Sequence, residues 1–198
     1  RLFVVDWSQS ARNFYASKGG LTQERFWSRT GITWSDIALQ SGFRLKSNDT
    51  EYSSVSPTIF PSENEDPDVR LLLLLNSSLV KWVMRALNPG LHANPGEVLK
   101  LPYIILGEAS SARRAIDLAK FDWDSYELSK EFAESPLVRR AIGTKRILEC
   151  VEELDQERVD AVLELKTIEE KSNSNYVSHF GLEDEVSIEV PLAEVSLT

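Results

Sequence analysis

Five consecutive leucines at positions 71 to 75 open the most hydrophobic stretch of the chain, which runs to Leu87. Asp66 followed by Pro67 predicts a helix start, because Asp is a good N-cap residue and Pro fits the first helical position. On a helical wheel the polar residues form one narrow stripe, and the apolar residues, Trp82 included, cover the rest. The stripe comprises Arg70, Ser77, Lys81, Arg85 and Asn88. The pattern predicts one mostly buried helix.

Two positions modify this predicted helix. Asn76 lies among the leucines, so we expect it to be hydrogen-bonded in the core or against a partner, with a functional contact as the alternative. Asn88-Pro89-Gly90 should end the helix, because Pro cannot continue it and Gly permits a sharp turn.

Shorter segments of the first half favour β-structure. β-branched and aromatic residues at 1–7 and 25–37 predict extended segments. At 42–49, Phe43 and Leu45 alternate with Arg44 and Lys46, which is typical of a half-exposed strand. The proline-rich segment 56–68 is expected to be a loop or a sheet edge, and 97–106 a short strand broken by proline.

The second half is predicted to be largely helical, at 110–121 with Arg113 and Arg114 exposed, and from 136 to about 171. Apolar residues repeat there with heptad spacing, which indicates a seam for another helix: Ile147, Leu154, Ala161 and Ile168, with Val151 and Leu165. The polar run 171–175 is expected to break the helix, followed by a helical turn and an extended tail. The expected fold is α+β: residues 1–107 form a small, mainly antiparallel sheet unit with a buried helix, and 108–198 form an acidic, mainly helical unit.

The composition limits the classes of protein to which the chain can belong. The leucine run lies between Arg70 and Lys81, which is far shorter than the roughly 20 apolar residues of a membrane-spanning helix. A single cysteine, Cys150, excludes an internal disulfide and suits a reducing cytoplasm, which is the expected location. The chain begins at Arg1 without Met, so we expect a piece of a longer protein.

The net charge of −9 is unevenly distributed. Residues 1–103 contain 11 Lys/Arg and 10 Asp/Glu, whereas residues 104–198 contain 11 and 21. The first half is therefore near neutral and could present a basic face to phosphates, while the second half carries the acidity.

Signatures of catalysis are missing from the sequence. Gly19-Gly20 predicts a turn rather than a phosphate-binding loop, and no nucleophile elbow or zinc-ligand spacing occurs. The acidic residues Asp122, Asp124 and Glu127 are best interpreted as a solvated face. An independent enzyme is therefore the least favoured of three hypotheses.

Several motifs in a fixed order carry a family resemblance. They are GITWSDI, SPTIFP, LLLLLNSSLVKWVMRALNPGLHANPGEVLKLPY, DWDSYELSKEF before SPLV, and the closing HFGLEDEV. Together they cover most of residues 25–185 and resemble the C-terminal portion of the PglX family. PglX proteins are adenine-specific DNA methyltransferases of the BREX phage-defence system, and type IIG restriction–methylation enzymes are related.

The resemblance implies a DNA target-recognition region whose partners are double-stranded DNA and an N-terminal methyltransferase domain. In such enzymes that domain binds S-adenosylmethionine and carries an Asn-Pro-Pro-Tyr motif around a flipped adenine. Here the Asn-Pro pairs are Asn88-Pro89-Gly90 and Asn94-Pro95-Gly96. We therefore expect no cofactor and no catalytic residue in this chain.

Candidate DNA contacts are cations and polar residues of the near-neutral half. The first group is Arg25, Arg29, Thr33, Arg44 and Lys46, of which Arg44 and Lys46 would share one exposed face; the second is Lys81, Arg85 and His92. The competing hypothesis is a protein-interaction module, in which the acidic half and the heptad seam dock the methyltransferase domain or another phage-defence protein.

Overall fold

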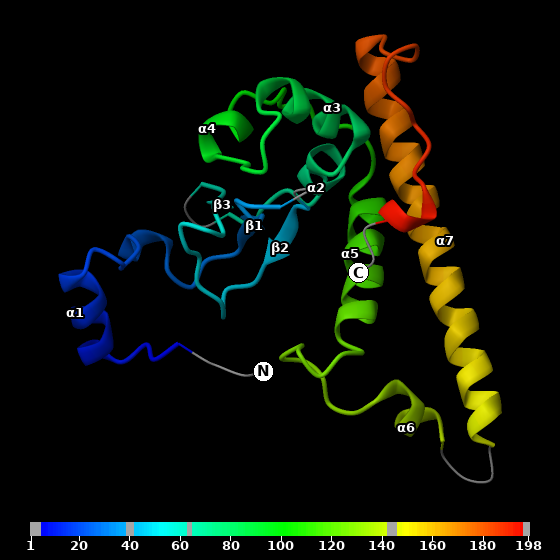
Figure 1. Cartoon of the computed structure of the whole chain (residues 1–198), viewed down its shortest axis with the longest axis horizontal. Helices are drawn as coiled ribbons and strands as arrows, with labels where there is room; N and C mark the ends of the chain where they lie inside the picture. Colours follow the sequence, from blue (N-terminus) through cyan, green and yellow to red (C-terminus); the bar gives the residue numbers. More distant parts are fainter. Residues whose placement is uncertain (1–4, 39–41, 63–64, 142–145, 196–198) are drawn as a thin grey trace.

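The computed structural model describes residues 5–38, 42–62, 65–141 and 146–195. A small sheet and short helices form a head, and two longer helices stand beside it (Figure 1). Along the chain the elements are α1 (Gln9–Ser17), η1 (Glu24–Phe26), β1 (Gly31–Thr33), β2 (Arg44–Lys46), β3 (Thr58–Ile59), α2 (Leu71–Leu75), α3 (Ser78–Leu87), α4 (Pro95–Val98), α5 (Ala109–Trp123), α6 (Pro136–Arg140), α7 (Ile147–Phe180) and η2 (Leu192–Glu194). The fold is α+β with a helical C-terminal region, as predicted.

The sheet is antiparallel, with the strand order β2-β1-β3. Ile32 of the central strand pairs with Leu45 on one side and with Ile59 on the other, and its side chain is fully buried. The strand expected within 42–49 is confirmed, and β3 confirms the edge interpretation of 56–68.

The leucine stretch forms two helices rather than one. Asn76 ends α2, and Ser77 begins α3 as an N-cap: its Oγ accepts a hydrogen bond from the Val80 N–H at 3.3 Å and donates one to the Leu74 carbonyl at 2.6 Å. The prediction of a continuous helix is therefore wrong, because the Ser77 hydroxyl takes hydrogen bonds that would otherwise stay within the helix backbone. The predicted stop is confirmed, since α3 ends at Leu87.

The start of the helix also differs from the prediction. Asp68, not Asp66, accepts a hydrogen bond from the backbone N–H of Arg70 at 3.0 Å, while Asp66 accepts one from the Thr30 hydroxyl. Trp82, expected in the core, is 40% exposed. The buried residues of α3 are Leu79 and Val80.

Helix α7 runs without a break through 171–175, contrary to the prediction. The polar residues there have tertiary partners: Ser172 donates to the Leu73 carbonyl at 3.2 Å, and Asn173 accepts from the Ser78 N–H at 2.8 Å. Because these side chains bond to other elements, they do not compete with the α7 backbone. Gly181 ends the helix with a φ of 65°, a left-handed conformation that favours glycine.

Other local predictions are corrected as well. The predicted strand at 1–7 falls partly outside the described residues, and residues 5–7 have no regular structure. The segment 97–106 contains no strand; instead, Asn94 and Glu97 form a capping box that starts α4. Arg113 and Arg114 are exposed on α5, as expected.

Three hydrophobic clusters fill the interior of the part of the chain that the structure describes. The first joins the sheet to α2, and the third joins α5, α7 and the C-terminal segment. The second unites leucines of α2 and α3 with Ala112 of α5 and Tyr176 of α7. The heptad seam is partly confirmed, because Leu154, Ala161 and Leu165 are buried; Ile147, at its beginning, is 72% exposed.

The second cluster has members on both sides of residue 107, so it packs the two predicted units against each other. The division into two domains stays a prediction. No helix of the described residues is long and apolar enough to cross a membrane.

Candidate nucleic-acid interface

Two cations of α3, Lys81 and Arg85, have no hydrogen-bond or ion-pair partner among the residues that the structure describes. They lie four residues apart and therefore on one face of the helix. Like charges at this spacing repel each other by a few tenths of a kcal/mol. This face is therefore suited to an anion.

The loop after α3 is held by side-chain hydrogen bonds. Asn88 donates to the His92 carbonyl and to Oε1 of Glu97, both at 3.0 Å, and Glu97 Oε2 accepts from the Asn94 N–H at 2.9 Å. Burial acts to raise the pKa of Glu97, but the hydrogen bonds from Asn88 and Asn94 outweigh it and lower the pKa. The charged carboxylate thus fixes the loop.

His92 lies in this loop with its side chain 55% exposed. Its Nδ1 is 3.1 Å from Oδ2 of Asp36. The backbones pair at the same place: the Ala93 N–H donates to the Asp36 carbonyl at 2.7 Å, and the Ala38 N–H donates to the Leu91 carbonyl at 3.0 Å. A cavity of about 80 Å³ brings together Lys81, Arg85 and His92, the second group of predicted DNA contacts.

Two residues of the first group bond to the protein itself. The Arg29 guanidinium donates to the carbonyls of Pro61 and Ser62 at 2.6 and 3.1 Å. The Thr33 hydroxyl donates to the Pro57 carbonyl at 3.0 Å. Both side chains therefore stabilise the connection to the β3 edge.

The expectation that Arg44 and Lys46 share one exposed face is wrong. Lys46 is 5% exposed, and its Nζ donates to the carbonyls of Arg29 and Ser47 at 2.8 and 3.0 Å. Burial lowers the pKa of the Lys46 ammonium, with Glu51 and Asp49 acting in the opposite direction. The long apolar stem lets a lysine occupy an inward position while its ammonium reaches carbonyl oxygens.

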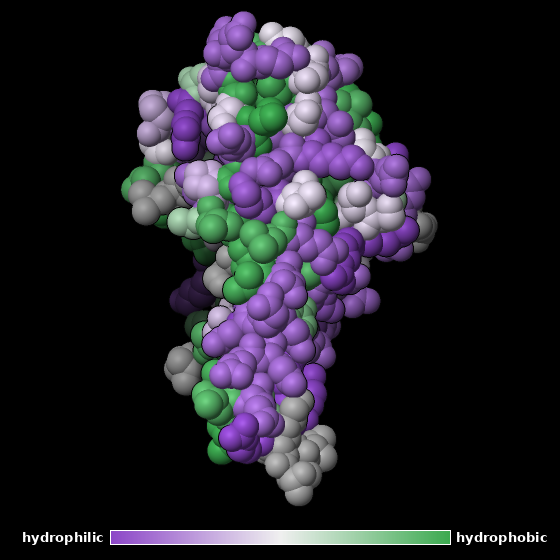
Figure 2. Space-filling model, turned by 90° about the vertical axis from the view of Figure 1, so that its right-hand side faces the viewer, coloured by the Kyte–Doolittle hydropathy of each residue, from purple (hydrophilic) through white to green (hydrophobic). Residues whose placement is uncertain are grey.

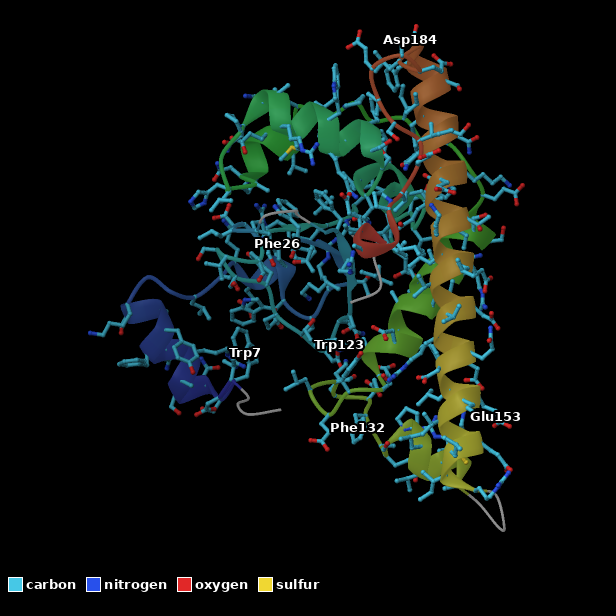
Figure 3. The ribbon with its side chains drawn as sticks, turned by 45° about the vertical axis from the view of Figure 1, so that its right-hand side comes forward. Trp7, Phe26, Trp123, Phe132, Glu153 and Asp184 are labelled. Atoms are coloured by element: carbon cyan, nitrogen blue, oxygen red, sulfur yellow. The ribbon has the colours of Figure 1, made fainter. Side chains whose placement is uncertain are left out.

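The Arg44 side chain lies in a different place from that of Lys46. Its guanidinium lines a cavity between β2 and α7, where burial lowers its pKa and Glu169 opposes that effect. Arg25 is exposed, and its guanidinium lies 4.6 Å from the centroid of the Phe26 ring, which stacks on Phe60. Figure 3 labels Phe26 near the strands of the head. The first group of candidates is thus spread over separate places, whereas the second group is assembled.

The cavity beside Arg44 measures about 700 Å³. Its walls come from β2, α2, α5 and α7, and they include Leu72, Ile116, Trp123, Leu165 and Glu169. Sequence reasoning missed this cavity, because no motif links these four elements and only their packing brings them together.

The described residues do not fit a site for S-adenosylmethionine. The glycines with positive φ are Gly19, Gly107 and Gly181, and none of them leads directly from a strand of the sheet into a helix, as a cofactor-binding glycine loop does. No three His, Cys, Asp or Glu side chains of the described residues gather as metal ligands.

Comparison with known proteins supports the resemblance to adenine-specific methyltransferases, but not to their C-terminal portion specifically. No family model matches the chain. The chain is 21% identical over 140 residues to the adenine-specific methyltransferase BrxX of Escherichia coli O9:H4 (strain HS), covering 69% of this chain and 12% of that protein. It is 27% identical over 184 residues to the adenine-specific methyltransferase PglX of Lacticaseibacillus casei (strain Zhang), covering 87% of this chain and 15% of that protein. The chain is thus weakly similar to adenine-specific methyltransferases and spans less than a sixth of the length of either relative.

Proposed function

We propose that this chain is the DNA target-recognition part of an adenine-specific DNA methyltransferase of a phage-defence system. In this proposal it binds duplex DNA and specifies the site that is methylated. Methyl transfer and S-adenosylmethionine binding belong to a separate catalytic domain, because this chain has neither Asn-Pro-Pro-Tyr nor a cofactor-binding glycine loop. The similarity to two adenine-specific methyltransferases supports the enzymatic context.

The observation that carries the proposal is the cation pair Lys81–Arg85 beside His92, which has no acidic partner among the residues that the structure describes. Arg70, Arg114 and Lys166, by contrast, already have acidic partners. A cation without a protein partner is free to replace the counterions around a phosphate, which is the main source of affinity for DNA. Lys81 and Arg85 would bind phosphates, while His92 and Trp82 lie close enough in the chain to reach the same duplex.

Fluorescence anisotropy with a labelled duplex over a series of salt concentrations tests the proposal. The double variant Lys81→Gln/Arg85→Gln should bind more weakly, and the slope of log K against log salt should become shallower by about 2, since each phosphate contact contributes about 0.9. The matched control is Arg113→Gln/Lys171→Gln, which removes two exposed cations elsewhere and should keep the slope of the wild type. Absence of binding by the wild type at low salt would overturn the proposal.

A protein-interaction module is the second candidate, favoured by exposed apolar side chains at the free end of the α6–α7 pair. Val138, Ile147 and Leu148 are 60%, 72% and 65% exposed. Figure 2 shows a mostly hydrophilic surface over this end of α7 with hydrophobic patches along one edge, and Glu153 points outward there in Figure 3.

This candidate predicts a stable complex with the methyltransferase domain or with another phage-defence protein. Sedimentation velocity with a purified methyltransferase domain would detect it, and Ile147→Ser/Leu148→Ser should abolish it. A matched variant of exposed apolar residues in the head, Leu91→Ser/Leu99→Ser, should leave the complex intact. If the wild-type chain forms no complex with any of these partners, the hypothesis of a protein-interaction module is contradicted.

A further inference from the structure

The Asp36–His92 pair differs from the two free cations beside it, because both its backbone and its side chains are fixed. The segments around the two residues form an isolated antiparallel bridge, and Asn88 holds the His92 carbonyl. The Trp34 indole N–H also donates to the Ala93 carbonyl at 2.6 Å, and Trp34 is 4% exposed. The exposed imidazole thus projects from a rigid part of the head.

The chemistry of the two groups decides which imidazole nitrogen carries the proton. An ionised carboxylate only accepts hydrogen bonds, so the 3.1 Å contact with Oδ2 of Asp36 places a proton on Nδ1 of His92. In the neutral ring Nε2 then holds a lone pair and acts as an acceptor. The Asp36 carboxylate is 18% exposed and its Oδ1 has no hydrogen-bond partner among the described residues, so Nδ1 of His92 is the side-chain donor that these residues offer it.

We infer that Asp36 is a positioning residue that presents Nε2 of His92 as a hydrogen-bond acceptor for the exocyclic amino group of adenine or cytosine in the major groove. This inference rests on the proposed function. Among the edges that bases expose in the major groove, only these amino groups donate hydrogen bonds. A rigid acceptor suits base readout because little conformational freedom is lost on binding, whereas the free Lys81 and Arg85 suit phosphates.

The first experiment needs no DNA. Nitrogen-15 NMR of the wild-type chain should show His92 protonated on Nδ1 and unprotonated on Nε2 at neutral pH. Asp36→Ala should lose this preference, whereas Asp36→Asn should retain it, because the amide oxygen can still accept from Nδ1. A wild-type ring protonated on Nε2 would overturn the inference whatever the DNA result.

The second experiment is selection of bound sequences from a randomised duplex pool. Asp36→Ala and His92→Ala should lower the preference for adenine or cytosine at one position of the site by about threefold to tenfold, the worth of one hydrogen bond. Asp36→Asn should restore most of that preference, and the salt slope should stay that of the wild type in all three variants. Circular dichroism verifies that each variant is folded.

The outcomes separate the two proposals. If the wild type selects a sequence but Asp36→Ala selects it equally well, the positioning role is wrong and the proposed function stands. If the wild type binds no duplex while its NMR spectrum shows His92 protonated on Nδ1, the proposed function and the base contact are both wrong.

Discussion

The side-chain amide of Asn76 pairs with the backbone of Phe43 as a neighbouring strand would. Its Oδ1 accepts from the Phe43 N–H at 2.9 Å, and its Nδ2 donates to the Phe43 carbonyl at 3.0 Å. Nδ2 also lies 3.1 Å from the Leu72 carbonyl. One residue between two helices thus connects the leucine run to the edge of the sheet, and the expectation of a hydrogen-bonded Asn76 is confirmed.

Replacing Asn76 should therefore destabilise the head. Asn76→Ala leaves both polar backbone groups of Phe43 without their partner, which should lower the free energy of unfolding by about 1–3 kcal/mol. Urea denaturation followed by circular dichroism measures the change. Asn48→Ala, at an exposed position, is the control and should change stability little. Equal stability of both variants would contradict the bridging role.

Gly31 should tolerate no side chain. A Cβ at this position would lie 2.6 Å from Cγ2 of Thr58 and 2.7 Å from the Ile59 carbonyl oxygen, so the β1–β3 pair would have to separate. Gly31→Ala should cost about 1–3 kcal/mol of stability, as overpacking does. Gly96→Ala is the matched control because nothing lies within 4 Å of its added Cβ. A thermal midpoint of Gly31→Ala at or above that of Gly96→Ala would disprove the close contact.

Tyr176 should make stability depend on alkaline pH. Its side chain is fully buried, and its hydroxyl hydrogen-bonds with both the N–H and the carbonyl of Leu106. Burial raises the pKa of the Tyr176 hydroxyl above its ordinary value of 10.0. The folded state therefore favours the neutral form. This stabilisation is complete below about pH 10 and is lost as pH rises through the raised pKa.

Tyr176→Phe should unfold about 1–2 kcal/mol more easily at pH 8, because the polar groups of Leu106 lose their partner. Above pH 10 this difference from the wild type should shrink. Tyr103→Phe, at a position 71% exposed, should match the wild type at pH 8. Urea unfolding at several pH values measures both effects, and a gap that stays constant from pH 8 to 11 would count against the titration of Tyr176.

Asp49 should titrate far below an ordinary aspartate. The hydrogen bond from Lys130, with a second from Ser47, lowers the pKa of Asp49 from 3.8 to about 2. Its contribution to stability is therefore present above pH 4 and lost as pH falls towards 2. Lys130→Met should return the pKa of Asp49 towards 3.8, while Lys120→Met should leave it unchanged. Carbon-13 NMR of the carboxyl group measures this pKa directly, and a value in the wild type near 3.8 would refute the ion pair.

The sequence predicts the helices and strands better than it predicts which residues are available to bind DNA. The sequence indicates that cations of the first half could bind DNA, but not which of them already have partners inside the protein. Arg29 and Lys46 donate to carbonyls of neighbouring strands and loops, and such contacts leave no sequence signal. Lys81, Arg85 and His92 are the second group of candidates, and the turn after α3 brings them together.

Local sequence by itself determined the α+β class, the end of α3 at Asn88-Pro89-Gly90, the strand around Leu45 and the exposed face of α5. These features depend on hydrophobic period, on the missing N–H of proline and on capping, all of which act within a few residues. Only the tertiary structure decided the break between α2 and α3, the continuity of α7 through 171–175 and the burial of Lys46. In each of these cases a polar side chain bonds to a segment far along the chain: Asn76 to Phe43 at the break, Ser172 of α7 to Leu73, and Lys46 to Arg29. The packed fold determines which of these partners is within reach.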